Sequence, residues 1–414
     1  MMDIAVYTLT SVLHDAKKVD ASTKEFLESL HILEMLKDDD YSDFGSHVLN
    51  LIFVRTGGTE GLFKRLLPSL NQHLSRPFYL LTSGESNSLA ASLEILSFLR
   101  QKGLSGEIIH GNTAYMMQKI AELYQVEQAI QRISKIRLGV IGQPSDWLIS
   151  SNVDYVSVKE HLGIELIDIP MGEVLKRLKC ETQVSERELL SIHEVKHIPE
   201  KVQTYLSGAT HIYHVLRQVV EDYFLEGFTI RCFDLLTTIH NTGCLALAQL
   251  NAEGIVAGCE GDIPALLSMA IGQKLLGVSG FQANPAYVDV EKGEITFAHC
   301  TIPLNMVQRY ELDTHFESGI GVGIRGYMQE GPVTVFKVAG NLSRYFVEEG
   351  LLIANQAKPN LCRTQQVIRL THPERVNYFL NEPIGNHHII LPGHCKALLD
   401  AVFAKLTNHN NNTL

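Results

Sequence analysis

Apolar residues follow two different patterns along the chain. In the first half, short apolar runs alternate with segments of helical spacing: HVLNLIFV precedes GLFKRLLPSLNQHL, and PFYLL precedes SLAASLEILSFLRQKG. EIIHG predicts another strand, while the spacing over residues 1–37 predicts helix. Strands and helices that alternate at short spacing are typical of a parallel sheet with helices on its faces. We therefore predict an N-terminal α/β domain over residues 1–130.

The alternating pattern restarts near residue 130. IRLGVIG and IELIDIP predict two strands, with helical spacing in VDYVSVKEHLG and MGEVLKRL, so we assign residues 131–227 to a second Rossmann-like domain. The long helical segment within 185–227 either completes the first domain or bridges to the third.

The last part of the chain has a different character. Beyond residue 227 six segments read as strands with few helices between them: FTIRCFDLL, GCLALAQL, EGIVAGCEGD, EITFAHCTIP, PVTVFKVAG and CRTQQVIRL. This pattern predicts a β-rich α+β or barrel-like domain over residues 228–414.

Composition narrows the class of protein. At 414 residues the chain is too long for one ordinary core, and 45% hydrophobic with 20% charged residues is typical of a globular protein. A net charge of −11 argues against nucleic acid or an anionic membrane as the main partner. Seven scattered cysteines without a CxxC motif indicate a reducing compartment, and we find neither a signal peptide nor a membrane-length apolar run. We expect a cytoplasmic protein that binds a small neutral or polar ligand.

Two carboxylates lie where the apolar strand GIVAG meets the helix IPALLSMAIGQKLLG. Asp262 precedes Ile263 and Pro264, a helix-start signature, so a capping role alone can explain it. Glu260 has no such explanation, because a carboxylate at the end of an apolar strand loses hydration unless it is paired or bound to a metal. Both are candidate catalytic residues.

Histidines at strand ends could complete a metal site with Glu260. His299 ends the strand ITFAHC, and NHHIILPGH supplies His387, His388 and His394. His387 and His388 would point to opposite faces of a strand, so at most one of them faces a given site. One carboxylate and two histidines make a suitable set of ligands for Mn²⁺ or a similar divalent ion, although each histidine could instead be a hydrogen-bonded core residue.

Other polar groups are candidates for binding a substrate, and His387 is one of them. Asp146 and Trp147 share a loop after a strand, and an aromatic ring beside a carboxylate is a common way to bind a sugar. His315 and Glu317 come from THFESG, where loop hydrogen bonding is the alternative. The turns TGGTEG and SGESNS could hold an oxygen-rich ligand but match neither a dinucleotide fingerprint nor a P-loop.

Several of these motifs together resemble the L-fucose isomerase and L-arabinose isomerase superfamily. The resemblance rests on AGCEGDIPALLSMAIGQKLLG, FQANPAYVD, AHCTIP, HFESGIGVGI, CRTQ and GNHHIILPG, and extends more loosely through TGGTE, SNSLAA and PSDWLI. It implies two Rossmann-like α/β domains followed by a β-rich domain, usually in a trimer or hexamer with sites between subunits. It also implies an Mn²⁺-dependent enzyme that interconverts aldoses and ketoses, acting here on a pentose, a 6-deoxyhexose or a modified sugar.

The resemblance assigns roles to particular residues. It implies that Glu260 is a metal ligand and catalytic group, and that His299 and His388 are metal ligands. The family's second acidic ligand falls at Asn284, whose amide oxygen can bind a metal but cannot take a proton. Asp262, His315 or Glu317 could fill that role; alternatively, the chain is a sugar-binding or regulatory protein, or carries out different sugar chemistry, on the isomerase fold.

Overall fold

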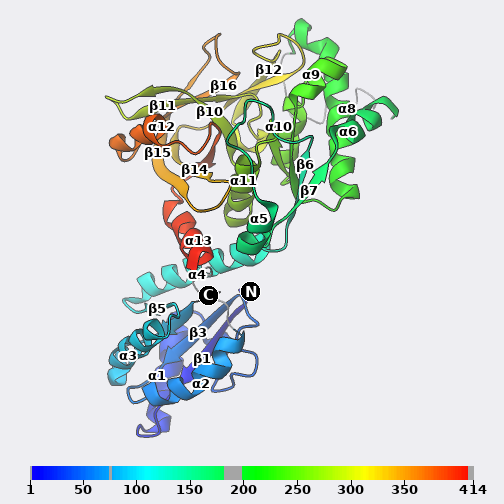
Figure 1. The fold of residues 1–414 in the computed structure, drawn as a ribbon. Helices are drawn as coiled ribbons and strands as arrows, with labels where there is room; N and C mark the ends of the chain where they lie inside the picture. The colour runs from blue at the N-terminus through cyan, green and yellow to red at the C-terminus, as the bar shows by residue number, and fades with distance from the viewer. Residues whose placement is uncertain (1, 74–76, 181–197, 409–414) are drawn as a thin grey trace. The chain divides into compact units, whose positions relative to one another are not determined.

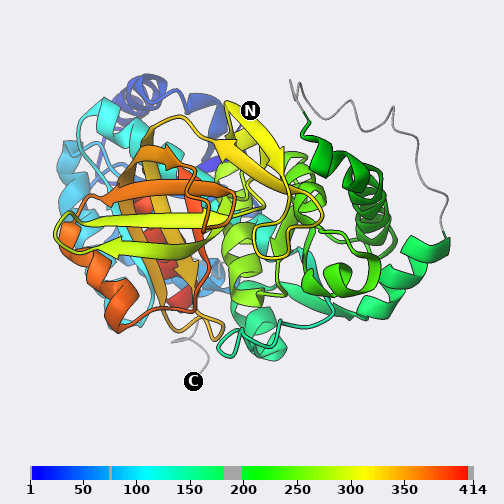
Figure 2. The ribbon, with the colours of Figure 1, turned by 90° about the horizontal axis from the view of Figure 1, so that it is seen from above.

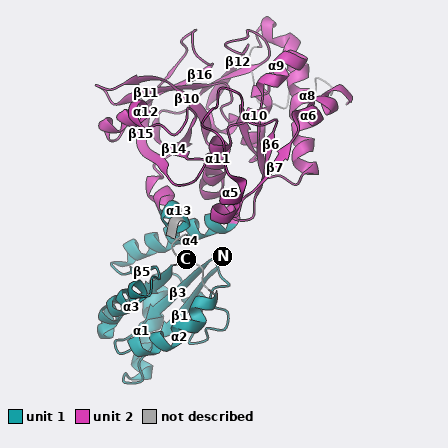
Figure 3. Cartoon of the chain, viewed as in Figure 1, with its two compact units in different colours: residues 1–131, 401–414 teal, residues 132–400 magenta. Residues whose placement is uncertain are grey.

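The protein divides into two compact units. The computed structural model describes residues 2–73, 77–180 and 198–408. Unit 1 comprises residues 1–131 and 401–414, and unit 2 comprises residues 132–400 (Figure 3). The division lies next to the point where the sequence pattern restarts. Residues 401–414 join unit 1 from elsewhere in the chain, whereas residues 198–227 of the predicted helical segment belong to unit 2.

Unit 1 is a five-stranded parallel sheet with helices along it (Figure 1). The strand order is β2-β1-β3-β4-β5, with β1 at Ile4–Leu9, β2 at Leu36–Asp38, β3 at Leu49–Val54, β4 at Phe78–Leu81 and β5 at Gly106–Ile109. The helices are α1 at Ala16–Ser29, α2 at Glu60–His73, α3 at Ser88–Gln101 and α4 at Thr113–Ile133.

The prediction of helix across residues 1–37 is wrong at its start. All six residues of β1 are buried, as in a central parallel strand that is covered on both faces. Helix α1 begins only after Asp15, whose side chain accepts a hydrogen bond of 3.1 Å from the Lys18 backbone N–H. This cap satisfies one of the free N–H groups of the first helical turn.

Unit 2 contains a second parallel sheet. Its order is β7-β6-β8-β9, with β6 at Arg137–Ile141, β7 at Glu165–Ile169, β8 at Gly227–Ile230 and β9 at Val256–Cys259. The helices around it are α5 at Tyr155–Leu162, α6 at Met171–Cys180, α8 at Glu200–Asp222, α9 at Phe233–Ile239, α10 at Cys244–Ala252 and α11 at Ile263–Leu276. Residues 185–197 of the predicted long helix lie outside the described residues. The predicted domain boundary at 227 falls inside this sheet, ahead of β8 and β9.

GCLALAQL is helix α10 rather than the predicted strand. Almost every residue of α10 is buried, including Cys244, Leu245, Leu247 and Leu250. A helix that is covered on all sides shows no amphipathic period, so its short apolar run cannot be told from a buried strand. Helix α11 is similarly apolar all round, because it packs on β8 and β9 on one side and on barrel strands on another.

Six later strands of unit 2 form a closed antiparallel barrel, which confirms the predicted β-rich C-terminal region. The order is β10-β11-β16-β15-β14-β17, with β10 at Phe281–Asp289, β11 at Glu294–His299, β14 at Gly331–Val338, β15 at Tyr345–Gln356, β16 at Thr364–Leu370 and β17 at His388–Pro392. The barrel does not include the hairpin of β12 (Arg309–Asp313) and β13 (Gly323–Tyr327), the short helix α12 (Tyr378–Asn381) or helix α13 (Lys396–Asn408). Figure 2 shows the barrel strands in yellow to red beside the green α/β part of the same unit.

Candidate active site

The turn between β9 and α11 has an unusual backbone. Glu260 has φ +63° and Gly261 has φ +73°, so two consecutive residues have a left-handed backbone conformation. A Cβ at Gly261 would overlap the carbonyl oxygen of Gln143, so this position requires glycine. The Glu260 carbonyl accepts a hydrogen bond of 2.9 Å from the Ser145 N–H. A non-glycine residue in this region costs about 1–3 kcal/mol and is typical of functional sites.

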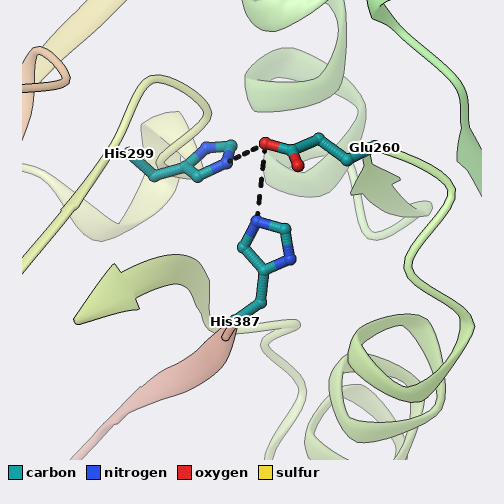
Figure 4. A group of neighbouring side chains, drawn as sticks. All are labelled: Glu260, His299 and His387. Atoms are coloured by element: carbon teal, nitrogen blue, oxygen red, sulfur yellow. Dashed lines mark ion pairs between the residues drawn. The ribbon is translucent and has the colours of Figure 1, made fainter. Parts of the chain in front are cut away.

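The Glu260 carboxylate meets two imidazoles in the protein interior. Its Oε1 atom lies 3.6 Å from Nε2 of His299 and 3.6 Å from Nε2 of His387 (Figure 4). Its Oε2 atom accepts a hydrogen bond of 2.6 Å from Nε1 of Trp147. Burial alone would raise the pKa of this carboxyl, but the two imidazoles lower it well below its usual range. Glu260 is therefore ionised and turned toward both histidines.

Neighbouring barrel strands bring the histidines together. Asn284 of β10 pairs with Ala298 of β11, and Ala283 pairs with His388 at the start of β17. His299 at the end of β11 and His387 just before β17 therefore lie on either side of β10. Asn284 lines the same cavity as Glu260, and its Oδ1 atom is buried without a hydrogen-bond partner among the described residues.

His387 is linked to two buried charged residues, Asp262 and Lys337. Its Nδ1 atom donates a hydrogen bond of 2.9 Å to Oδ2 of Asp262, and both Asp262 oxygens lie 3.3 Å from Nζ of Lys337 on β14. Asp262 also caps α11 by accepting a hydrogen bond of 2.8 Å from the Ala265 N–H. Asp262 does not line the cavity, so this placement favours the capping explanation over direct catalysis.

The charges around His387 favour a cation at its Nε2 atom. Burial alone would lower the pKa of His387, but Glu260 and Asp262 raise it to about 9. The Nε2 atom is buried and has no hydrogen-bond partner in the described part of the chain. Nδ1 on a carboxylate with Nε2 left free is the arrangement in which proteins present a histidine to a metal.

His388 points elsewhere. Successive strand residues face opposite sides, and the His388 ring packs among Phe297, Phe346, Tyr378 and Phe379. Its Nε2 lies 3.0 Å from the Tyr378 hydroxyl and its Nδ1 lies 3.0 Å from the Asn386 carbonyl oxygen. Burial and the charge of Lys337 lower the pKa of His388 to about 3, so it is neutral. The structure brings His387, which the sequence suggested for substrate, to Glu260 in place of His388.

A cavity of about 500 Å³ opens onto Glu260 and His299. Trp147, His315 and Glu317, which the sequence suggested for substrate binding, also line it. The Phe233 ring packs edge-on against Trp147 at 4.8 Å and against His315 at 5.7 Å. Asp146 instead pairs with Arg231 at 2.8 Å and lies on the surface, so it does not join the others.

The donor set fits a divalent metal ion. Glu260, His299 and His387 each offer a ligand atom, and these atoms lie within 4.8 Å of one another. Carboxylate and imidazole are ligands that Mn²⁺, Fe²⁺ and Zn²⁺ accept. The amide oxygen of Asn284, which lines the same cavity, could serve as a further ligand. The fit explains why Nε2 of His387 is buried with no hydrogen-bond partner among the described residues and only the ion-pair contact with Glu260.

Comparison with known proteins points to sugar isomerases. No family model matches the chain. It is 21% identical over 268 residues to the sulfoquinovose isomerase of Alkalicoccus urumqiensis, and 21% identical over 271 residues to that of Priestia megaterium. Each match covers 61% of this chain and 59% of the relative. A protein of the same name from a Clostridium species is 30% identical over 113 residues, 27% of this chain and 24% of the relative.

The chain is a distant relative of proteins named sulfoquinovose isomerase. It spans 59% of the length of the first of these relatives. No described helix is both long enough and apolar enough to cross a membrane.

Sequence reasoning missed two features of the site. The first is the buried Lys337. It lies in the apolar segment PVTVFKVAG, and a lysine within an apolar strand could have indicated a buried ion pair. The second feature is a set of five cysteines that line the cavity: Cys232, Cys244, Cys259, Cys300 and Cys362. Nothing in the sequence indicated this set, because its members are far apart along the chain and only the fold brings them together.

Proposed function

We propose that the chain is a metal-dependent aldose–ketose isomerase, with Mn²⁺ as the first candidate ion. The observation that carries this proposal is the convergence of two Nε2 atoms on one ionised Glu260 oxygen beside a cavity of about 500 Å³. The distant similarity to proteins named sulfoquinovose isomerase supports a modified sugar as substrate. Glu260, His299 and His387 would hold the ion, with the Asn284 amide beside them.

The isomerisation moves one proton between C1 and C2 of the sugar, and we assign the ionised Glu260 carboxylate as the group that takes and returns it. A bound divalent ion would polarise the O1 and O2 oxygens and stabilise the negative charge of the ene-diolate. Trp147 holds Oε2 of Glu260 and so fixes which oxygen faces the histidines. The cavity is also lined by an imidazole and a carboxylate outside the metal set, those of His315 and Glu317. We assign the acid–base work on the oxygens to this pair, because Asn284 cannot carry a proton.

Asp262 takes no direct part in this scheme. Its carboxylate is held by Lys337, His387 and the first turn of α11, which leaves it no access to the cavity. Its role is to keep the proton of His387 on Nδ1, so that Nε2 is free to bind the ion. We further propose a homo-oligomer with sites near the subunit interfaces, as the superfamily resemblance implies, which light scattering on the purified protein tests.

The adjacent histidines offer a matched test of the metal site. The protein has a single tryptophan, and Trp147 contacts Glu260 directly, so Mn²⁺ at the site should quench its fluorescence. We expect His387→Gln to weaken Mn²⁺ binding at least tenfold and His388→Gln to leave the affinity unchanged. Equal affinities in the two variants, or stronger loss in His388→Gln, would contradict the assignment of His387.

Isomerase activity needs its own assay. A panel of pentoses, 6-deoxyhexoses and sulfonated sugars should show Mn²⁺-dependent exchange of solvent deuterium at C1 or C2. The second candidate function is a sugar-binding protein, which the amide of Asn284 at the second acidic position favours. Sugar binding without deuterium exchange across the panel would support that alternative and refute the isomerase.

A further inference from the structure

Five of the seven cysteines line the cavity that Glu260 faces. They are Cys232, Cys244, Cys259, Cys300 and Cys362, and all seven cysteines are free thiols in the structure. Neither the metal ligands nor the acid–base pair described above uses a thiol. The proposed isomerase chemistry therefore does not explain why five free thiols line one cavity.

Cys232 and Cys259 stand out as a pair. Their Sγ atoms lie 3.0 Å apart, and both residues are buried. Cys259 is the last residue of β9, and Cys232 lies two residues beyond the end of the neighbouring parallel strand β8. Ile230 of β8 pairs with Cys259 of β9, and the Cys232 N–H donates a hydrogen bond of 2.8 Å to the Ile230 carbonyl. That bond closes a tight turn directly after β8 and holds Cys232 close to β9. The two Sγ atoms therefore need to move together by only about 1 Å to reach the S–S bond length of about 2.05 Å.

We propose that Cys232 and Cys259 are a redox modification site that forms a reversible disulfide in the cavity wall. The oxidant is a peroxide small enough to enter the cavity. One thiol takes an oxygen atom from hydrogen peroxide to give a sulfenic acid, with release of one water. The second thiol attacks that sulfur, the S–O bond breaks and a second water leaves. Two thiols and one peroxide thus give one disulfide and two waters.

The exposure of the two residues assigns the order of these steps. Cys232 is the more exposed of the two, at 7% against 3%, so its sulfur is the one that the oxidant meets first. Cys259 is the thiol that resolves the sulfenic acid.

The disulfide would join two segments that shape the site. Cys259 directly precedes Glu260, and Cys232 directly precedes Phe233, whose ring packs against Trp147 at 4.8 Å. Bond formation draws the sulfur atoms from 3.0 Å to about 2.05 Å, so both neighbours must adjust. Trp147, which contacts both Phe233 and Glu260, therefore reports on the modification by its emission. The inference does not depend on isomerase activity.

Thiol counting and peptide mapping test the proposal on the full chain. After treatment with one equivalent of hydrogen peroxide, the denatured protein should titrate five thiols in place of seven, and dithiothreitol should restore seven. Alkylation, digestion and mass spectrometry should find the peptides of Cys232 and Cys259 cross-linked, with a change in Trp147 emission that dithiothreitol reverses.

The exposed Cys180 at the end of α6 supplies a matched control. Cys180→Ser should lower the thiol count by one and keep the cross-link, whereas Cys259→Ser should abolish it. Cys300 is the competing partner, because its thiol interacts with those of Cys244 and Cys362. Cross-links through Cys300, or sulfinic acid at Cys232 without a disulfide, would overturn the proposal in the wild-type protein, whether or not the variants fold.

Discussion

Lys337 should be essential for the stability of unit 2. The Lys337 side chain is 1% exposed and its Nζ atom lies 3.3 Å from both oxygens of Asp262. Lys337→Met removes the cation. Among the described residues, the buried carboxylate then keeps His387 and the Ala265 N–H as hydrogen-bond partners. Breaking a buried pair in this way costs about 3–5 kcal/mol. With a slope of about 3 kcal/mol per molar urea, the unfolding midpoint should fall by roughly 1–1.7 M.

The single tryptophan makes this measurement specific. Trp147 lies in unit 2, so its fluorescence follows the urea unfolding of that unit. The double variant Lys337→Met with Asp262→Asn is the control, because asparagine can still accept from Ala265 but carries no charge. We expect it to recover at least half of the loss. A midpoint for Lys337→Met within about 0.2 M of the wild type, or a further loss in the double variant, would refute the reasoning.

Three further predictions concern the turn and the adjacent strand. Glu260→Gln should abolish deuterium exchange and weaken Mn²⁺ binding at least tenfold by fluorescence titration, and an unchanged rate and affinity would contradict its role. Gly261→Ala should lower the free energy of unfolding by at least about 2 kcal/mol, because the residue is left-handed and its Cβ would meet Gln143; urea unfolding checks this. The pKa of His388 is lowered to about 3, so its stabilising effect is present above its unfolded pKa and is lost as pH falls. Between pH 6.5 and 5 the wild type should lose up to about 2 kcal/mol more than His388→Leu, and parallel pH profiles would count against this.

Local sequence signals identified one half of the site. Glu260 was recognisable because a carboxylate at the end of an apolar strand needs a partner, and the structure supplies two imidazoles and an indole. The choice between His387 and His388 was not recognisable. It depends on the register of β17 against β10, which long-range pairing determines and which a shift of one residue would reverse.

The fold shows the same division between local and long-range information. The alternation of strands and helices was predicted correctly for most of unit 1, because the spacing of apolar residues within each element indicates its type. The buried strand β1 and the buried helix α10 were misread, since elements that are covered on every side lose the polar positions that reveal their period. Lys337 escaped notice because its partner Asp262 is 75 residues away in the chain.

The left-handed backbone at Glu260 places stability and chemistry in competition at one position. Glycine or asparagine would adopt φ +63° with less strain than glutamate, and neither would bring a charge into the interior. A library randomised at residue 260 and selected for heat resistance should therefore enrich those two residues. The same library selected for turnover should return glutamate, so sequencing the two pools would measure how much folding free energy the protein gives up at this turn.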